Sequence, residues 1–160
     1  QLAQKHAEGH WRVRLALSVT GAVQFTVVQL LPSAEPVKLQ LARQPILNAV
    51  AQSDVVRFKT SVRHHYQVFE PKSAEVFDTV LFNENGQITE GTRGNIAMQL
   101  DGQWVTPALQ CGLLPGVGRA LALSQGRLVE KVVVIDDLRR ITGWAFVNSL
   151  RGWLDARLIA

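Results

Sequence analysis

The sequence contains little of what secreted, zinc-binding and membrane-spanning proteins use. Its 160 residues include one cysteine, Cys111, which excludes an intrachain disulfide, and no Cys/His spacing typical of a zinc site is present. No apolar run approaches the roughly 18 to 20 residues that span a bilayer, and the first ten residues lack the apolar region of a signal peptide. These absences predict a protein of the reducing cytoplasm, with no metal and no membrane partner.

The sequence also has no cluster of charged residues of one sign. Lys and Arg number 17 and Asp and Glu 13, giving a net charge of +4, but the basic residues are scattered along the chain. Because nucleic-acid backbones bind basic residues gathered on one face, the scatter argues against a nucleic-acid partner, while anionic small molecules stay possible. Hydrophobic residues make up 47% of the chain, which predicts a folded protein with a core.

Alternating patterns and turn residues in the first third of the chain predict a small sheet. Residues 11–19 and 22–31 read as two strands around Thr20-Gly21, and residues 36–42 as a third, half-buried strand. Residues 45–54 show no clear period, so we place a junction between two units there. The chain starts without a methionine and opens as the tail of a helix ending at Gly9, and we expect that a segment preceding Gln1 is missing.

The rest of the chain predicts an α+β arrangement with a mostly antiparallel sheet. Asn85-Gly86 and Asp101-Gly102 are strong hairpin signals, because Asn, Asp and Gly tolerate the positive φ that such turns need. Further expected elements, in chain order, are a helix within 59–70 closed by Pro71, a strand at 76–82, a helix within 113–124, a strand at 127–135, a helical turn at 136–141 and a strand at 144–150.

Two charged residues could carry chemistry. Lys59 is flanked by Phe58 and Val62, where an amine can be partly desolvated and used as a nucleophile. Glu90 stands alone as a carboxylate near the start of a predicted hairpin. From local sequence, a surface lysine and a solvated glutamate are the simpler interpretations.

Two polar segments are further candidates. In "LLPGVGR", small residues lead into a helix, so Val117 and Gly118 can offer free N–H groups to an anion, although most such turns bind nothing. In "FVNSLRG", a hydrophobic strand ends in Asn148 and Ser149, which can equally well cap the strand. An amine, an acid, N–H donors and a hydroxyl are together what pyridoxal phosphate requires of a protein.

The order and spacing of four motifs carry a family resemblance. The chain resembles the fold-type IV pyridoxal-phosphate enzymes and is most similar to the 4-amino-4-deoxychorismate lyase domain often fused to aminodeoxychorismate synthase component I. The motifs are "FKTSVRHHY", "ITEGTRGNIAMQLDGQWVTP", "CGLLPGVGRALAL" and "FVNSLRGWLDARL". The resemblance implies that residues 1–52 are the remainder of a truncated small α/β domain and that residues 53–160 form the large cofactor-binding domain.

The resemblance assigns roles to the candidates. Lys59 matches the lysine that bonds the cofactor covalently, and Glu90 the acid that pairs with its pyridine nitrogen. Val117 and Gly118 match the turn that holds the phosphate, and Ser149 a hydroxyl donor on its other side.

Three residues extend this cofactor site. Arg63 matches a lyase-like arginine near the ring, and Arg93 and Asn148 are candidates for substrate binding. The chain also departs from the aminotransferases, which commonly carry threonine at the position of Gly118 and Gly-Thr-Ala at positions 148–150. By this resemblance, the family's phosphate-binding arginine lies upstream of Gln1, so residues 1–160 alone are not expected to hold the complete phosphate site.

The implied reaction converts 4-amino-4-deoxychorismate to 4-aminobenzoate and pyruvate in folate biosynthesis. An aminotransferase of the branched-chain or D-amino-acid type is the alternative within the same fold. A third alternative is an inactive fragment that only packs or dimerises. A homodimer is expected by resemblance, because in this family a neighbouring chain completes the pocket.

Overall fold

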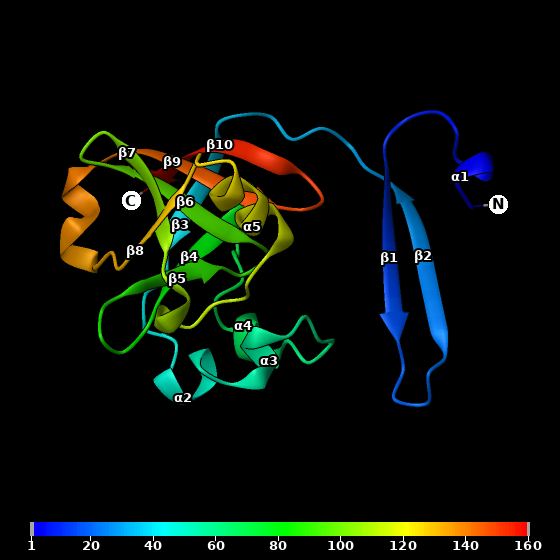
Figure 1. Ribbon diagram of the computed structural model, residues 1–160, viewed down its shortest axis with the longest axis horizontal. Coiled ribbons are helices and arrows are strands. Elements are labelled where there is room, and N and C mark those ends of the chain that lie inside the picture. Colours follow the sequence, from blue (N-terminus) through cyan, green and yellow to red (C-terminus); the bar gives the residue numbers. More distant parts are fainter. Residues whose placement is uncertain (1, 160) are drawn as a thin grey trace. The chain divides into compact units, whose positions relative to one another are not determined.

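The structure is a computed structural model that describes residues 2–159, and its contacts divide it after Ala34 into two compact units (Figure 1). The first unit contains α1 (Leu2–Lys5) and one antiparallel pair of strands, β1 (Trp11–Leu17) and β2 (Val23–Gln29). In the turn between the strands, Gly21 adopts φ +82°, which side chains other than glycine rarely allow. The hairpin predicted from the sequence is therefore confirmed.

The hairpin presents one apolar face. Leu15 pairs with Phe25 and Leu17 with Val23, and directly opposed residues two positions apart share a face of a strand pair. Leu15 and Leu17 are 70% and 73% exposed. An isolated two-stranded hairpin is marginally stable in water, so this face needs a cover.

The second unit is built on an eight-stranded sheet with the strand order β5-β4-β3-β10-β9-β6-β7-β8 (Figure 1). Its strands are β3 (Val37–Leu41), β4 (Asp78–Phe82), β5 (Ile88–Gly91), β6 (Asn95–Leu100), β7 (Gln103–Pro107), β8 (Val129–Lys131), β9 (Ile141–Asn148) and β10 (Gly152–Ile159). Its helices are α2 (Asn48–Ala51), α3 (Asp54–Arg57), α4 (His64–Gln67) and α5 (Val117–Ser124), with 3-10 turns η1 (Leu109–Cys111) and η2 (Ile135–Arg140).

The sheet is mixed, and one expectation is corrected. The strand expected to complete the small sheet, β3, instead pairs in parallel with β10 and β4. The β7–β8 pair is also parallel, but the other strand pairs are antiparallel, so the expected mostly antiparallel sheet is confirmed. Residues 152–159 were not expected to form a strand, yet they form β10, which joins β3 to β9. The boundary expected after residue 52 separates the small and large domains of the family. The division after Ala34 does not test it, so it stays a prediction.

A crossover segment, residues 42–77, connects the parallel strands β3 and β4, because parallel neighbours cannot be joined by a tight turn. It carries α2, α3 and α4, and Lys59 lies in the turn between the last two. The helix expected within 59–70 is confined to α4. The run Thr60-Ser61-Val62 explains its late start, because Thr and Val lose side-chain freedom in a helix and Ser competes for backbone hydrogen bonds.

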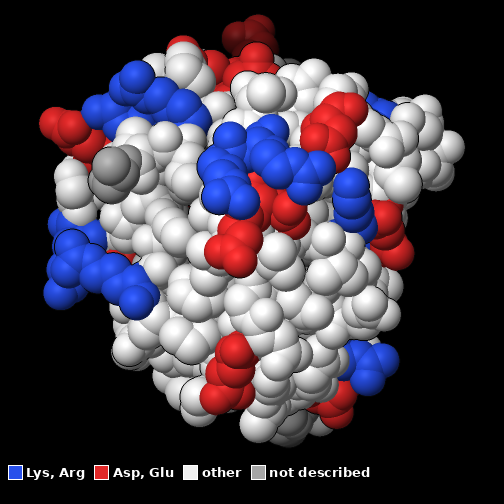
Figure 2. All heavy atoms as spheres, turned by 90° about the vertical axis from the view of Figure 1, so that its left-hand side faces the viewer, with Lys and Arg blue, Asp and Glu red and all other residues white. Residues whose placement is uncertain are grey.

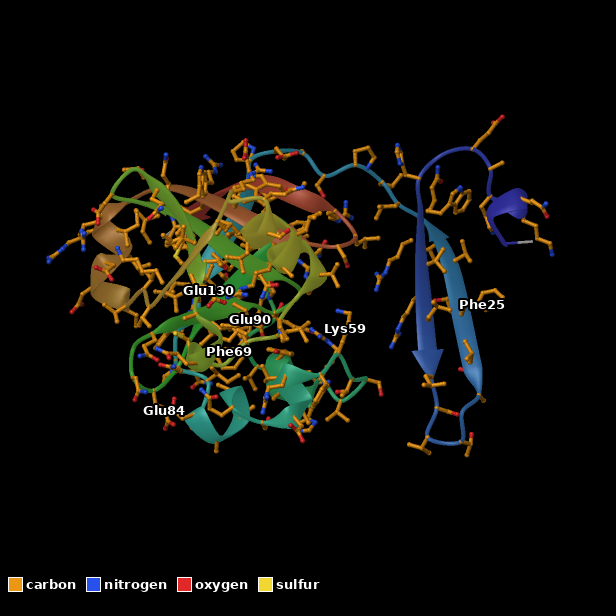
Figure 3. The ribbon with its side chains drawn as sticks, viewed as in Figure 1. Phe25, Lys59, Phe69, Glu84, Glu90 and Glu130 are labelled. Carbon is orange, nitrogen blue, oxygen red and sulfur yellow. The ribbon has the colours of Figure 1, made fainter. Side chains whose placement is uncertain are left out.

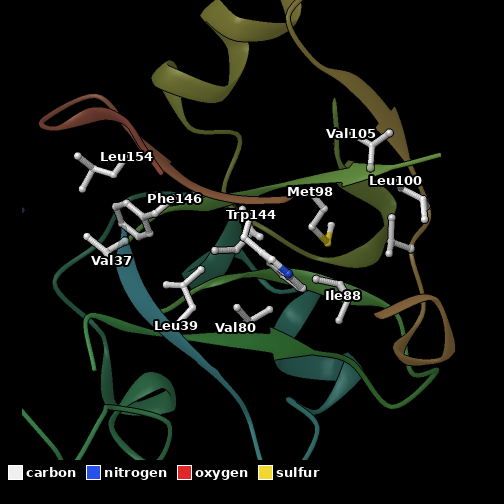
Figure 4. Packing of buried hydrophobic residues seen from close by; sticks show 12 residues of the cluster. Val37, Leu39, Val80, Ile88, Met98, Leu100, Val105, Trp144, Phe146 and Leu154 are labelled. Atoms are coloured by element: carbon white, nitrogen blue, oxygen red, sulfur yellow. The ribbon is translucent and has the colours of Figure 1, made fainter. Parts of the chain in front are cut away.

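The main hydrophobic core fixes the strands that carry the site. Leu39, Val80 and Ile88, on β3, β4 and β5, are 0% exposed and belong to one cluster with Phe146 of β9 (Figure 4). Interiors this closely packed resist displacement of a backbone segment. The backbone of β5 is therefore held firmly where it carries Glu90.

Charged side chains of both signs are interspersed on the face drawn in Figure 2. Some charged side chains of the second unit form ion pairs; Arg140, for example, contacts Asp101 and Asp137. Within residues 2–159, no helix is long and apolar enough to cross a membrane.

Candidate active site

Glu90 is a buried carboxylate on β5. The pairing of β4 with β5 shifts by one residue between Val80 and Phe82, and such irregularities commonly redirect side chains next to functional sites. Glu90 is 4% exposed, so it is not the solvated glutamate that local sequence favours. Its Oε1 accepts a hydrogen bond from the Tyr66 hydroxyl at 2.6 Å, and its Oε2 accepts one from the Leu114 N–H at 3.1 Å.

Burial is the main influence on the charge of Glu90. Loss of solvent raises its pKa to about 7, although the bonds from Tyr66 and Leu114 act in the opposite direction. The carboxyl group is therefore balanced between its two forms near neutral pH. A cation placed beside it would favour the ionised form.

Lys59 lines the same pocket as Glu90 but differs from it in exposure. It is exposed, as the surface lysine favoured by local sequence would be, and not desolvated. Within the described residues, its amine has no hydrogen-bond or ion-pair partner and so is available to a ligand. Figure 3 shows Glu90 within the sheet and Lys59 on the crossover segment.

Two arginines line the pocket beside them. Arg63 donates from Nη2 to the carbonyl oxygen of Thr92, and its guanidinium lies 4.8 Å from the centroid of the Tyr66 ring. The guanidinium of Arg93 lies 5.0 Å from the centroid of the Phe77 ring. Arg93 also borders a neighbouring hollow, so one side chain can face ligands in both spaces.

The enclosed part of the pocket is small. Its volume is about 40 Å³, whereas sites for ring-sized ligands usually measure several hundred Å³. The neighbouring hollow is about 450 Å³ and shares Thr92 and Arg93 with the pocket. Residues 58–62, which include several of the lining residues, are all exposed.

The start of α5 adjoins the end of β9. The Cα of Gly118 is so close to this strand that a Cβ there would lie 2.9 Å from the carbonyl carbon of Asn148. The first N–H groups of a helix lack intrahelical acceptors, so Val117 and Gly118 present donors at this end. The structure thus brings the two segments predicted to hold phosphate together.

Asn148 and Ser149 differ in how free their side chains are. The Oδ1 of Asn148 accepts hydrogen bonds from the N–H groups of Leu150 and Arg151, at 3.1 and 2.8 Å, which caps the turn after β9. Its Nδ2 lies 3.4 Å from the carbonyl oxygen of Arg93. Ser149 is exposed, and within the described part of the chain its hydroxyl has no partner, so it can donate to a ligand.

Residues outside the sequence-based candidates support the site. Leu114 donates its N–H to Glu90, and its carbonyl oxygen accepts a hydrogen bond from Asn95 Nδ2 at 2.9 Å. The backbone of this one residue therefore ties the loop before α5 to β5 and β6. The sequence carries no sign of such a backbone role.

Asp78 is the second buried acid near the pocket, 0% exposed on β4. Its Oδ1 accepts from the Thr92 hydroxyl and from the N–H groups of Thr79 and Thr92, and its Oδ2 accepts from the Arg93 N–H at 3.0 Å. Burial raises its pKa, against these hydrogen bonds. In the sequence, the presence of an acid within the apolar strand "VFDTVLF" could have indicated that Asp78 is buried and has a structural role.

Comparison with known proteins identifies the family. The family described as "Amino-transferase class IV" matches residues 1–159. A Schizosaccharomyces pombe protein named "Putative aminodeoxychorismate lyase" is 34% identical over 124 residues, and the match covers 74% of this chain and 53% of that protein. The chain thus spans about half the length of this relative.

Solved structures match as well. The crystal structure of a "Putative amino-acid aminotransferase" from Mesorhizobium loti has a TM-score of 0.86 and 36% identity, covering 99% of this chain and 78% of that one. A branched-chain amino acid aminotransferase from Thermobaculum terrenum, solved in its PLP form, has a TM-score of 0.71 at 14% identity, covering 85% of this chain and 48% of that one. The predicted fold-type IV architecture is confirmed, and the chain belongs to the class IV aminotransferase family.

Proposed function

We propose that this chain is part of a pyridoxal-phosphate enzyme that converts 4-amino-4-deoxychorismate to 4-aminobenzoate and pyruvate, a step of folate biosynthesis. The observation that supports it best is a pocket shared by Lys59, whose amine has no partner among residues 2–159, and a buried acid, Glu90. The S. pombe relative favours the lyase reaction over the alternatives.

The donor groups of the chain fit the cofactor. Lys59 offers an amine for the aldehyde, and Glu90 a carboxylate for the ring nitrogen. The N–H groups of Val117 and Gly118 and the free hydroxyl of Ser149 suit a phosphate. Arg63 lines the pocket near the expected place of the ring. When bound, pyridoxal phosphate supplies an electron-withdrawing ring that stabilises negative charge on the substrate carbon next to the amino group.

Lys59 has two tasks in this proposal. Its amine would hold the cofactor's aldehyde, and as a free amine it would act as the base that removes the proton from C4 of the substrate. Loss of that proton allows the C–O bond between the ring and the enolpyruvyl ether to break, so that enolpyruvate leaves; pyruvate forms when its methylene carbon takes up a proton. The remaining ring becomes aromatic, which drives the reaction forward.

In this proposal the negative charge of Glu90 acts on the ring nitrogen of the cofactor, and Arg93 binds the substrate. The ionised Glu90 carboxylate beside the ring nitrogen favours the protonated nitrogen. Arg93 is a suitable partner for a carboxylate of the substrate, because it faces both the pocket and the 450 Å³ hollow. Asn148 is a second candidate for substrate contact, through the Nδ2 that lies 3.4 Å from the carbonyl oxygen of Arg93.

The reaction is tested by incubating the chain with cofactor and 4-amino-4-deoxychorismate in the absence of any keto acid. Release of pyruvate and 4-aminobenzoate is expected, and a requirement for a keto acid would indicate the aminotransferase instead. Lys59→Ala is expected to lose the activity and the covalently bound cofactor, measured by borohydride reduction and peptide mapping. Lys5→Ala, in the other unit, is the control. Reduced cofactor found on another residue would remove Lys59 from this role.

We also propose that the chain forms a homodimer. The apolar hairpin face defined by Leu15, Leu17, Val23 and Phe25 supports this, because a second copy would cover it. A fusion to aminodeoxychorismate synthase component I, a cytoplasmic location and the absence of nucleic-acid partners remain predictions.

A further inference from the structure

We propose that Tyr66 is a positioning residue whose hydroxyl holds the Glu90 carboxylate ionised and oriented toward the pocket. For the ring nitrogen this inference rests on the proposed function. The bond between Tyr66 and Glu90, in contrast, is a property of the chain itself and can be tested without any ligand.

The geometry around Glu90 supports the role. Tyr66 lies on α4 and is 5% exposed, and its hydroxyl donates to Glu90 Oε1 at 2.6 Å, a short distance typical of a bond to a charged acceptor. Leu114 donates to Oε2. The two donors come from the crossover segment and from the loop before α5, so they fix the carboxylate from both sides.

The chemistry of a buried carboxylate explains why this bond matters. Burial opposes the charge of Glu90, and the Tyr66 hydrogen bond is the largest influence that favours it, ahead of the Leu114 N–H. A protonated carboxyl group cannot act as the anion for a cationic nitrogen. Without the hydroxyl, Glu90 should therefore remain protonated to a higher pH.

The other charged and titratable groups near this pair do not replace Tyr66. Asp78 of β4 repels negative charge on Glu90, and Arg63 attracts it from the end of the pocket that α4 borders. Lys59 lines the pocket but is exposed to solvent. The His65 ring centroid lies 4.0 Å from that of Tyr66, and burial lowers the pKa of His65, which favours its neutral form.

The first experiment follows Glu90 directly. Glutamate labelled with ¹³C at the carboxyl carbon is incorporated into the full chain without cofactor, and the Glu90 resonance is assigned by its loss in Glu90→Gln. In Tyr66→Phe we expect the titration midpoint of Glu90 to rise by about one pH unit, roughly a tenfold change in the ratio of protonated to ionised forms. An unchanged midpoint in folded Tyr66→Phe would overturn the proposal.

A matched control separates the hydroxyl from packing. Phe69 belongs to the same buried cluster as Tyr66. Phe69→Leu alters this packing and should leave the Glu90 midpoint where it is in the unmodified chain. A shift as large as that of Tyr66→Phe would assign the effect to packing and overturn the proposal.

A second measurement decides the question if Tyr66→Phe does not fold. The chain has one tyrosine, so phenolate absorbance reports Tyr66 alone. Burial, followed by the charge of Glu90, raises the Tyr66 pKa. Glu90→Gln should therefore let Tyr66 ionise at a lower pH than in the unmodified chain, and identical phenolate titrations would contradict the coupling.

The cofactor provides the last readout. With pyridoxal phosphate bound, Tyr66→Phe should move the pH dependence of the cofactor's visible absorbance in the same direction as the carboxyl titration. An absorbance profile that does not move would overturn the role toward the ring. A chain that binds no cofactor would refute the proposed function, while the two titrations would still decide the Tyr66–Glu90 coupling.

Discussion

At the residue scale, Glu90 obtains its properties from its surroundings. The residue is an ordinary glutamate in the sequence, yet burial moves its pKa to about 7. Carboxyl groups that titrate near the operating pH are common at functional sites, because they can hold either protonation state when needed. The same shift also makes the stability of the fold depend on pH.

The pH dependence of stability gives a prediction for Glu90. A folded-state pKa above the ordinary value of 4.5 means that the folded chain binds the proton more tightly than the unfolded chain. This contribution to stability is fully present below about pH 4.5 and is lost as the pH rises through about 7. The loss is on the order of 3 kcal/mol. Urea unfolding at several pH values should show it in the unmodified chain.

Glu90→Gln is the matched comparison, because glutamine keeps the shape and does not titrate. The difference in unfolding free energy between the two proteins should change between pH 4.5 and 7, since Asp78 titrates in both and cancels. If the unfolding free energies of the two proteins, plotted against pH, stay parallel across this range, the raised pKa of Glu90 is contradicted.

At the element scale, the turn after η1 determines how the loop before α5 meets the crossover segment. Gly112 adopts φ +90°, and a Cβ there would lie 2.6 Å from the Ala51 Cβ at the end of α2. Leu114, two residues later, donates its N–H to Glu90. A change at this turn should therefore disturb the pocket as well as the fold.

Gly112→Ala should lower the unfolding free energy through both backbone strain and the collision with Ala51, together by about 2 to 5 kcal/mol. Gly126→Ala is the matched control, because Gly126 also has positive φ, +68°, but nothing lies within 4 Å of an added Cβ. Gly126→Ala should lower the unfolding free energy through backbone strain alone, by about 1 kcal/mol. Equal losses in the two variants, measured by urea unfolding, would rule out the collision.

At the scale of the whole molecule, the apolar hairpin face leads to a prediction about assembly. A dimer that buries this face should weaken when a charge is placed in it, because an uncompensated charge is costly to desolvate. Leu15→Asp should shift the chain toward monomer in sedimentation or light-scattering experiments. Thr26→Asp is the control, since Thr26 pairs with Arg14 on the opposite face. A monomeric unmodified chain, or equal effects of both substitutions, would contradict the dimer.

The sequence by itself determined the local features of this protein. Asn85-Gly86, Asp101-Gly102 and Gly126 form the turns expected of them, with Gly86, Asp101, Gly102 and Gly126 at positive φ, and α5 begins after Gly116 as expected. The motifs also identified the family and named both Lys59 and Glu90. These features were predictable because each depends on the conformational preferences of a few neighbouring residues or on a match of residue types.

The burial of Glu90 and its hydrogen bond to Tyr66, which lies 24 positions away in the chain, follow only from the tertiary structure. The exposure of Lys59 and the parallel pairing of β10 with β3 also follow only from it. The strand "GWLDARLI" gave no clear alternating signal, and its partner lies more than a hundred residues earlier. The free energies of desolvation and of strand pairing depend on groups that only the folded chain brings together. For that physical reason, a residue's neighbours in the sequence could suggest the two ends of the site but not the environment that sets the charge of Glu90.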